Sequence, residues 1–204
     1  AGSRAAPMSR EQRRAAIIEA TLPLLRTHGQ AVTTRQIAEA SGIGEGTIFR
    51  VFRDKAELID DCLTATFDPA PTLQEFAAID RRLPLEQRLL AAVRVLQDRL
   101  LSVVELLIAL GFPGPPDGEE QHRMHPRARF GHRELLDAIT ELIEPDRDRL
   151  RLPPAEIARI ARLLTFAASH PKITDGEPMS APAIVSVLLY GVLAPGEQAE
   201  DRRC

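Results

Sequence analysis

The chain has 204 residues, of which 44% are hydrophobic, and it carries a formal net charge of −3. This composition is typical of a globular protein with one substantial core or two smaller ones, and it excludes a protein that coats nucleic acid over its whole surface. No stretch reaches the roughly 20 apolar residues that span a bilayer, and the first ten residues contain no apolar secretory segment. We therefore expect a cytoplasmic protein without a membrane partner.

The charge is distributed unevenly along the chain. Residues 1–55 hold nine Lys and Arg against five Asp and Glu, whereas residues 56–204 hold seventeen against twenty-four. A basic first quarter followed by an acidic remainder is compatible with a polyanion-binding unit, but a solvated basic face produces the same pattern. The charge distribution alone therefore leaves both interpretations open.

Apolar residues recur at helical spacing along most of the chain, so we expect an all-α fold. No stretch shows the period-two alternation, bounded by turns, that is typical of strands. The first expected helix is residues 10–28. Three short helical pieces follow within residues 33–59, and the pattern after residue 55 lengthens into a helix that stops before residue 68. The remaining expected helices are residues 72–79, 85–110, 127–143, 154–169 and 181–193. The segment 111–126 is rich in Gly and Pro and is predicted to be a loop.

The most specific pattern is TTRQIAEASGIGEGTIFRVFRDKAELI, residues 33–59. Thr33 and Thr34 can cap a short helix, and Gly42 stands where the chain must turn sharply. The small Ala38, four residues before Gly42, allows two helices to approach closely. A helix-turn-helix, in which two helices cross at about 90–120° through a short turn, requires this combination.

The second helix of this motif is predicted to have one buried and one exposed face. Ile48 and Phe52, one turn apart, are expected to anchor it. The residues left toward solvent are Glu45, Gly46, Thr47, Phe49 and Arg50. Such a slim, polar face suits the major groove of DNA. Asp54 is expected to cap the next helix, where Lys55 can hold a DNA phosphate together with backbone amides.

Residues 13–63 resemble the TetR family of bacterial transcriptional regulators. The spacing that carries the resemblance is that of Ile37, Ala38, Gly42, Thr47, Phe49, Phe52, Lys55 and Leu58. The resemblance implies an N-terminal three-helix DNA-binding domain with a helix-turn-helix over residues 8–55 and a linking helix over residues 55–67. It also implies a larger helical domain over residues 68–204 that dimerises and binds a small ligand.

By position, the resemblance implies nine DNA-contacting residues: Thr33, Thr34, Arg35, Glu45, Gly46, Thr47, Phe49, Arg50 and Lys55. The residues that begin the second and fourth helices would touch phosphates, and those of the recognition helix would face base edges or backbone. The family commonly has tyrosine where this chain has Phe49, and often histidine where it has Val51. We expect both differences to remove a side-chain donor from the phosphate surface.

The last two expected helices are unusually apolar, which indicates either a central place in the monomer or a seam with a second copy. Candidate seam residues are Ala161, Leu164, Ala168, Ile184, Val187 and Leu188. A homodimer would hold two recognition helices about one DNA turn apart, or a multiple of it, so the operator should be an inverted repeat.

A small, mostly apolar effector is expected in the second domain, although each candidate contact residue is more often plain core. The candidates are Leu100, Val104, Leu107, Phe112, Phe130 and Phe166. The sequence itself does not identify the effector.

The leading hypothesis is a dimeric, ligand-responsive repressor that binds palindromic operator DNA and is released by its effector. The alternative is a helical ligand sensor or protein-interaction module that has lost sequence-specific DNA binding. The sequence contains no phosphate-cradling glycine loop, nucleophile elbow or CxxC pair, so we expect neither an enzyme nor a cofactor. His122, His125 and His132 lack the spacing of a metal site, and none is expected.

Overall fold

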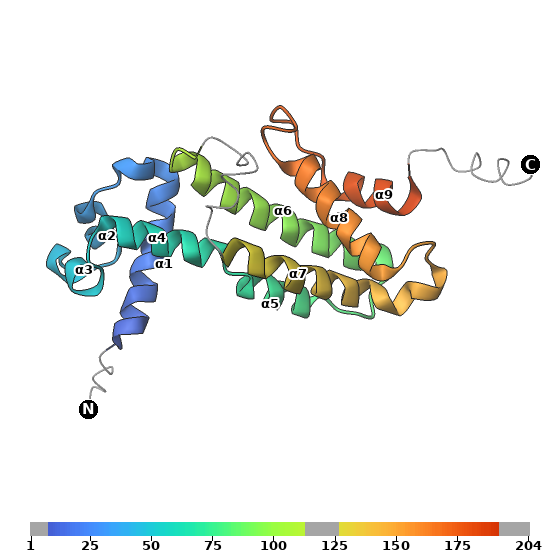
Figure 1. Cartoon of the computed structure of the whole chain (residues 1–204), viewed down its shortest axis with the longest axis horizontal. Coiled ribbons are helices and arrows are strands. Elements are labelled where there is room, and N and C mark those ends of the chain that lie inside the picture. Colours follow the sequence, from blue (N-terminus) through green and yellow to red (C-terminus); the bar gives the residue numbers. More distant parts are fainter. Residues whose placement is uncertain (1–7, 113–126, 192–204) are drawn as a thin grey trace, which may run out of the picture. The chain divides into compact units, whose positions relative to one another are not determined.

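The structure is a computed structural model that describes residues 8–112 and 127–191, without the side chains of residues 127–132. Its elements are α1 (Arg10–His28), η1 (Gly29–Ala31), α2 (Thr34–Ala40), α3 (Glu45–Val51), α4 (Lys55–Phe67), α5 (Ala70–Ala78), α6 (Leu85–Ala109), α7 (Arg127–Ile143), η3 (Glu144–Arg149), α8 (Pro154–Ser169) and α9 (Ala181–Tyr190). All regular structure in the described residues is helical, which confirms the expected all-α fold (Figure 1).

The chain divides into two compact units. The first comprises the described residues within Ala1–Asp68 and Ser102–Ala128, and the second those within Pro69–Leu101 and Arg129–Cys204. Helices α1 to α4 belong to the first unit together with the C-terminal part of α6. Helices α5, α8 and α9, η3, most of α7 and the N-terminal part of α6 form the second unit.

Three of the four N-terminal helices begin at a residue whose side chain satisfies an otherwise unpaired backbone amide. Ser9 precedes α1, Thr33 precedes α2 and Asp54 precedes α4, and each accepts a hydrogen bond from the N–H three residues later. In α1 and α2 a glutamine at that third position bonds back to the capping residue and completes a capping box. The chain can therefore start short helices close together.

The turn between α2 and α3 has the geometry predicted for a helix-turn-helix. Gly42 adopts a φ of +65°, its N–H donates to the Glu39 carbonyl oxygen, and the Ile43 N–H donates to the Ala38 carbonyl oxygen. These two bonds form a Schellman motif, which ends a helix with a residue in the left-handed region. Because glycine adopts this conformation at little cost, Gly42 lets α3 begin three residues later.

The first unit has its own hydrophobic core, which also receives the C-terminal end of α6. Its buried members are Ile17, Leu25, Val32, Ile37, Ala38, Ile48, Val51, Phe52, Leu58, Cys62, Leu106 and Leu110. Burial raises the pKa of Cys62 to about 12, so its thiol acts as a small apolar group. The core contacts one face of each short helix and so determines which face remains exposed.

The second unit packs α5, α6, α7, α8 and α9 around a separate core. Its largest fully buried side chains are Leu89, Ile139, Leu142, Ile143 and Ile184. Arg88 is also buried there, where it donates to the Leu142 carbonyl oxygen and to Asp146. This charge is tolerated inside the protein because it is paired and hydrogen-bonded.

Two details of the helices differ from the sequence prediction. The helix expected at residues 72–79 begins earlier, at Ala70, and the helix expected to reach residue 193 ends at Tyr190. Gly191 takes a φ of +72° at that end and caps the helix. Beyond residue 112, the predicted loop lies outside the described residues, as do His122 and His125.

Gly29 is the position where α1 meets the C-terminal end of α6. It adopts a φ of +55°, and a Cβ built there would overlap the carbonyl oxygen of Ala109. We expect Gly29→Ala to lower the free energy of unfolding by about 3 kcal/mol, since both backbone strain and overpacking oppose it. Gly42→Ala is the comparison, because Gly42 also has a positive φ but has open space around it, whereas Gly29 combines its φ with a ψ of −138°.

For Gly42→Ala we expect only the conformational cost of about 1 kcal/mol. Urea unfolding of the two variants, followed by circular dichroism, measures the difference. Equal destabilisation by both substitutions would show that the contact between Gly29 and α6 does not constrain the backbone.

Candidate nucleic-acid interface

Helix α3 exposes the face that the sequence predicts for DNA contact. Glu45, Gly46, Phe49 and Arg50 are exposed, and Thr47 is half-buried. The opposite face is closed by the core, because the buried Ile48 and Phe52 anchor it. Phe49 has 52% of its surface exposed, so the helix presents an aromatic ring to solvent. Such a ring can contact the methyl group of thymine.

Val51 does not lie on this exposed surface, and the expectation that it replaces a phosphate donor is wrong. Its side chain is 5% exposed and lies in the core of the first unit. The physical reason is helical periodicity, since a residue three positions after Ile48 shares the buried face of α3. Of the two noted departures from the family pattern, only Phe49 changes the exposed surface.

Several candidate DNA-binding side chains have partners within the protein. The Thr34 hydroxyl donates to the Glu45 carboxylate and so joins the first residues of α2 and α3. Arg35 forms an ion pair of 3.3 Å with Glu39, one turn along α2. Thr33 caps α2. These contacts orient the side chains before any partner arrives, and the exposed ion pair adds little stability of its own.

Lys55 is held at the N-terminus of α4 by a backbone group of the η1 turn. Its Nζ donates to the Gln30 carbonyl oxygen at 2.6 Å, and the Gln30 side chain donates to the Leu110 carbonyl oxygen at 2.7 Å. The side chain of Arg50, in contrast, forms no hydrogen bond or ion pair with any residue that the structure describes. The interface therefore offers one placed ammonium group and one guanidinium group free to reach a ligand.

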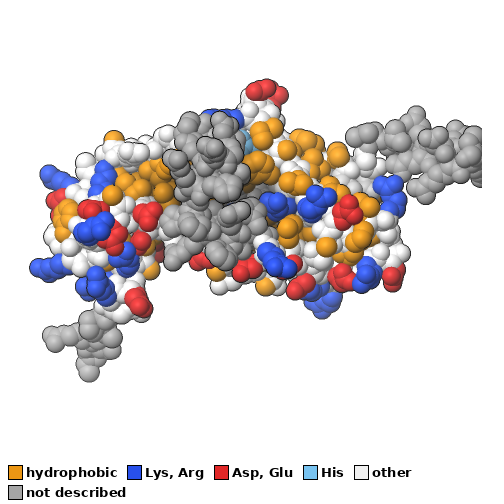
Figure 2. Space-filling model, in the orientation of Figure 1, with side chains coloured by type: hydrophobic (Ala, Val, Ile, Leu, Met, Phe, Trp, Pro, Cys, Tyr) orange, Lys and Arg blue, Asp and Glu red, His pale blue; other side chains and the backbone are white. Residues whose placement is uncertain are grey.

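Basic side chains are frequent over the first unit in Figure 2. Arg35 on α2 and Arg53 just after α3 have 82% and 81% of their side-chain surface accessible. Arg53 forms an ion pair of 2.9 Å with Asp54, which holds the pKa of Arg53 above its ordinary value. This surface can attract a polyanion.

Arg14 of α1 was not among the predicted site residues, yet it contacts the end of α3. Its guanidinium bonds to the carboxylates of Glu57 and Asp61 and to the Val51 carbonyl oxygen. The hydrogen bond from Arg14, followed by the N–H of Arg53, holds the pKa of Glu57 below its ordinary value. Sequence spacing gave no signal for this cluster, because its members lie on three different helices and a turn.

The predicted effector residues are spread over both units. Val104, Leu107 and Phe112 belong to the first unit, and Leu100 and Phe166 to the second. Val104 is buried, Leu100 and Leu107 are half-buried, and the two phenylalanines are exposed. The side chain of Phe130 lies outside the described residues.

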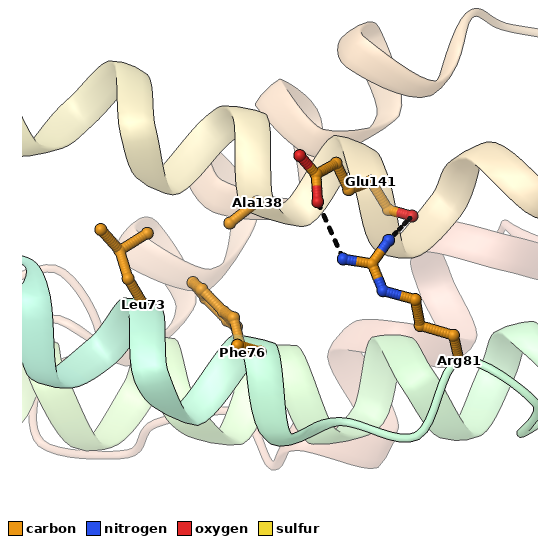
Figure 3. A pocket seen from close by; sticks show the side chains of 6 residues that line it. Leu73, Phe76, Arg81, Ala138 and Glu141 are labelled. Carbon is orange, nitrogen blue, oxygen red and sulfur yellow. Dashed lines mark hydrogen bonds and ion pairs between the residues drawn. The ribbon is translucent and has the colours of Figure 1, made fainter.

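A small pocket of about 180 Å³ lies in the second unit between α5 and α7, and none of the predicted effector residues lines it. Figure 3 shows Leu73 and Phe76 of α5 facing Ala138 of α7. At its edge, Arg81 bonds to the Glu141 carboxylate at 2.8 Å and to the carbonyl oxygen of the same residue at 3.3 Å. The sequence pattern missed this pocket because its apolar residues share their spacing with the core.

Helices α8 and α9 pack against each other and carry the predicted seam residues. Ala161, Ala168 and Ile184 are buried within the single chain, and the other three are half-buried: Leu164, Val187 and Leu188. Large apolar side chains are exposed on the same two helices, namely Leu163, Phe166 and Tyr190. The single chain thus covers part of the predicted seam and leaves a neighbouring apolar surface open.

Among the side chains that the structure describes, no group of three or more His, Cys, Asp or Glu is arranged to hold a metal ion. None of the described helices combines the length and the apolar character needed to cross a bilayer.

Comparison with known proteins gives one family match in sequence and many similarities in fold. Residues 17–62 match the sequence profile of the bacterial regulatory proteins of the tetR family. The chain matches none of the curated protein sequences. The sequence match covers α2, α3 and most of α1 and α4, which carry the interface described above.

Three similar solved structures are those of regulators. The TetR-like transcriptional regulator LfrR from Mycobacterium smegmatis, in complex with proflavine, has 22% sequence identity and a TM-score of 0.53, and the match covers 91% of this chain and 99% of that chain. The transcriptional regulator FadR from Bacillus subtilis, in complex with stearoyl-CoA, has 11% identity and a TM-score of 0.55, with 88% of this chain and 99% of that chain covered. The fatty acid degradation regulator FadR from Bacillus halodurans has 15% identity and a TM-score of 0.58, with 95% of this chain and 100% of that chain covered. These similarities extend over nearly the whole of each chain and show the fold.

The shifted pKa of Glu57 predicts a contribution to acid unfolding. A carboxylate whose pKa is lower in the folded state stabilises the fold above its unfolded pKa, and this stabilisation is lost as the pH falls through the folded pKa. We expect the unfolding free energy of the wild type to decrease as the pH falls below 4.5, the ordinary pKa of a glutamate. Glu57→Gln should show a smaller decrease over the same range, because it has no charge to lose.

Urea titrations between about pH 3 and 7 measure this difference. Glu105→Gln, at an exposed position of α6 in the same unit, is the control and should follow the wild type. Parallel profiles for the wild type and Glu57→Gln would contradict the role of the Arg14–Glu57 pair.

Proposed function

We propose that the chain is a TetR-family transcriptional regulator and, more specifically, a dimeric, ligand-responsive repressor that binds an inverted-repeat operator through α2, α3 and the start of α4. The observation that carries the DNA-binding part is the exposed face of α3, within the segment that matches the family. The repressor acts where its operator DNA is, so we assign it to the cytoplasm of a bacterial cell.

In this proposal the candidate residues divide into two kinds. Thr33, Thr34, Arg35 and Lys55 contact phosphates and fix the position of the protein on the duplex. The remaining candidates face base edges or the DNA backbone from α3: Glu45, Gly46, Thr47, Phe49 and Arg50. The absence of an internal partner for Arg50 within the described residues supports a base-reading role, since a guanidinium can bond to guanine O6 and N7 together.

The partners of the phosphate-contacting residues do not oppose this role. The exposed Arg35–Glu39 pair contributes little, so exchanging it for a phosphate costs little free energy. The ammonium group of Lys55 has three donors, and its bond to the Gln30 carbonyl oxygen uses only one. It can therefore stay in place and also bind a phosphate oxygen.

The apolar surface of α8 and α9 supports the homodimer. Leu163, Phe166 and Tyr190 are large apolar side chains exposed on these two helices, and a second copy would cover them through an isologous contact. Leu164, Val187 and Leu188, half-buried in the single chain, are placed to extend the same contact. Two-fold symmetry then pairs the recognition helices with the two halves of an inverted repeat.

A small, mostly apolar effector is the remaining part of the proposal. Two proteins of similar fold were solved with proflavine and with stearoyl-CoA, which supports a ligand-binding role for the helical second unit. The chain has one tyrosine and no tryptophan, so an aliphatic or mixed ligand suits it better than a flat aromatic one. Such a ligand releases DNA only if it binds the DNA-free conformation more tightly.

Selection of bound duplexes from a random DNA pool tests the proposal directly. We expect enrichment of an inverted repeat, and a titration of the selected duplex at two salt concentrations should give a steep decrease of affinity with salt. Sedimentation of the complex would give two chains per duplex. A folded protein that enriches no sequence would overturn the repressor proposal in favour of a sensor or interaction module that does not read DNA.

Substitution of two residues separates base reading from phosphate binding. Arg50→Ala should weaken binding to the selected operator by about 1–3 kcal/mol and relax the preference at one base pair, because it removes a base contact. Lys55→Ala should weaken binding to all duplexes nearly equally and reduce the salt slope by about 1. Fluorescence anisotropy with the operator and with single-base variants measures both effects.

Asp148→Ala, at an exposed acidic position of η3 in the second unit, is the control and should bind like the wild type. A uniform loss on every duplex for Arg50→Ala would exclude its base-reading role and place it among the phosphate contacts.

A further inference from the structure

The side chain of Arg14 occupies the junction between α1, α3 and α4. Its Nε donates to Asp61 Oδ2 at 2.5 Å, its Nη2 to Glu57 Oε1 at 2.7 Å and its Nη1 to the Val51 carbonyl oxygen at 3.0 Å. The guanidinium also lies 4.4 Å from the centre of the Phe52 ring. Only 29% of the side chain is exposed, so Arg14 is not available as a long-reaching DNA contact.

These contacts connect α1 with the end of α3 and with α4. Val51 is the last residue of α3, and the final carbonyl groups of a helix have no partner within it. A guanidinium at that end satisfies one of them and interacts favourably with the helix dipole. The second carboxylate oxygen of Glu57 accepts from the Arg53 N–H at 2.6 Å, so the turn between α3 and α4 is tied to the same cluster.

We propose that Arg14 is a positioning residue for the recognition helix, fixing the orientation in which α3 projects from α1 and α4 without touching DNA. The inference rests on the proposed function, since it concerns the helix that reads the operator. A planar guanidinium can bond to three acceptors in fixed directions and lie against a ring at once. A lysine ammonium has no comparable planar geometry.

Stability alone does not account for this arrangement. Arg14, Glu57 and Asp61 keep 26–31% of their side-chain surface exposed, and partly exposed ion pairs contribute modestly to folding. Orientation matters more, because a bidentate base contact must be held to within about 0.5 Å of its productive geometry. A small rotation of α3 would move Arg50 and its neighbours away from the base edges while leaving the core intact.

The test is Arg14→Lys in the full chain, measured against the operator selected by the wild type. We expect its affinity for that operator to fall by about tenfold, as for the loss of one base contact, and its affinity for a scrambled duplex to stay unchanged. Arg147→Lys is the matched control, because Arg147 forms an exposed ion pair of 2.6 Å with Glu144 in the second unit. Operator affinity of Arg14→Lys equal to that of the wild type overturns the inference.

Amide hydrogen exchange gives a second readout that does not need DNA. Arg14→Lys should accelerate exchange in peptides covering residues 45–53 and leave the core of α1 protected. Acceleration across α1 and α4 to the same extent would show that Arg14 only stabilises the unit, and would overturn the inference. If Arg14→Lys does not fold, Asp61→Asn removes a single partner, and the same local pattern of exchange is expected.

Failure of this inference is distinguishable from failure of the proposed function. If the wild type selects no operator, the repressor proposal fails, and the exchange pattern still decides whether Arg14 positions α3. If the wild type selects an inverted repeat and Arg14→Lys binds it equally well, the repressor proposal stands and the role of Arg14 is rejected.

Discussion

The interface depends on the burial of one face of two very short helices. Helices α2 and α3 have seven residues each, fewer than an isolated helix needs to be stable in water. They persist because Ile37, Ile48 and Phe52 pack into a shared core with α1 and α4. The same burial determines which residues face solvent, because a helix that buries one stripe must expose the opposite one. The candidate reading surface is therefore a consequence of the core.

This dependence explains which parts of the molecule could be predicted from the sequence. The bounds of α1, α7 and α8 agree with the periodic pattern, and Ser9 and Pro154 mark the starts of α1 and α8 by local chemistry. Val51 was misplaced because the family pattern was followed where helical spacing from Ile48 indicates the core. Arg14 was missed because its partners lie 37 to 47 residues away in the chain, beyond any local signal.

The second unit was harder to interpret from the sequence for a different reason. An apolar face indicates that something covers it, but not whether the cover is the same chain, a second copy or a ligand. Ala161 and Ile184 are covered by their own chain, whereas Leu163 and Phe166 lie on the same helices and are exposed. All four are apolar residues of apolar helices, and their packing in the folded chain separates the buried ones from the exposed ones.

The polar contacts of the first unit fall into two groups, which differ in how easily an anion such as phosphate can replace the acceptor within the protein. Lys55 and Arg35 each bond to an acceptor near the surface, and a phosphate oxygen can join or replace that acceptor at little cost. Arg14 bonds to three acceptors and lies against a ring, so no single anion can substitute for its surroundings. In the proposed function, an operator thus recruits the outer cations, while the contacts of Arg14 remain as they are in the free protein.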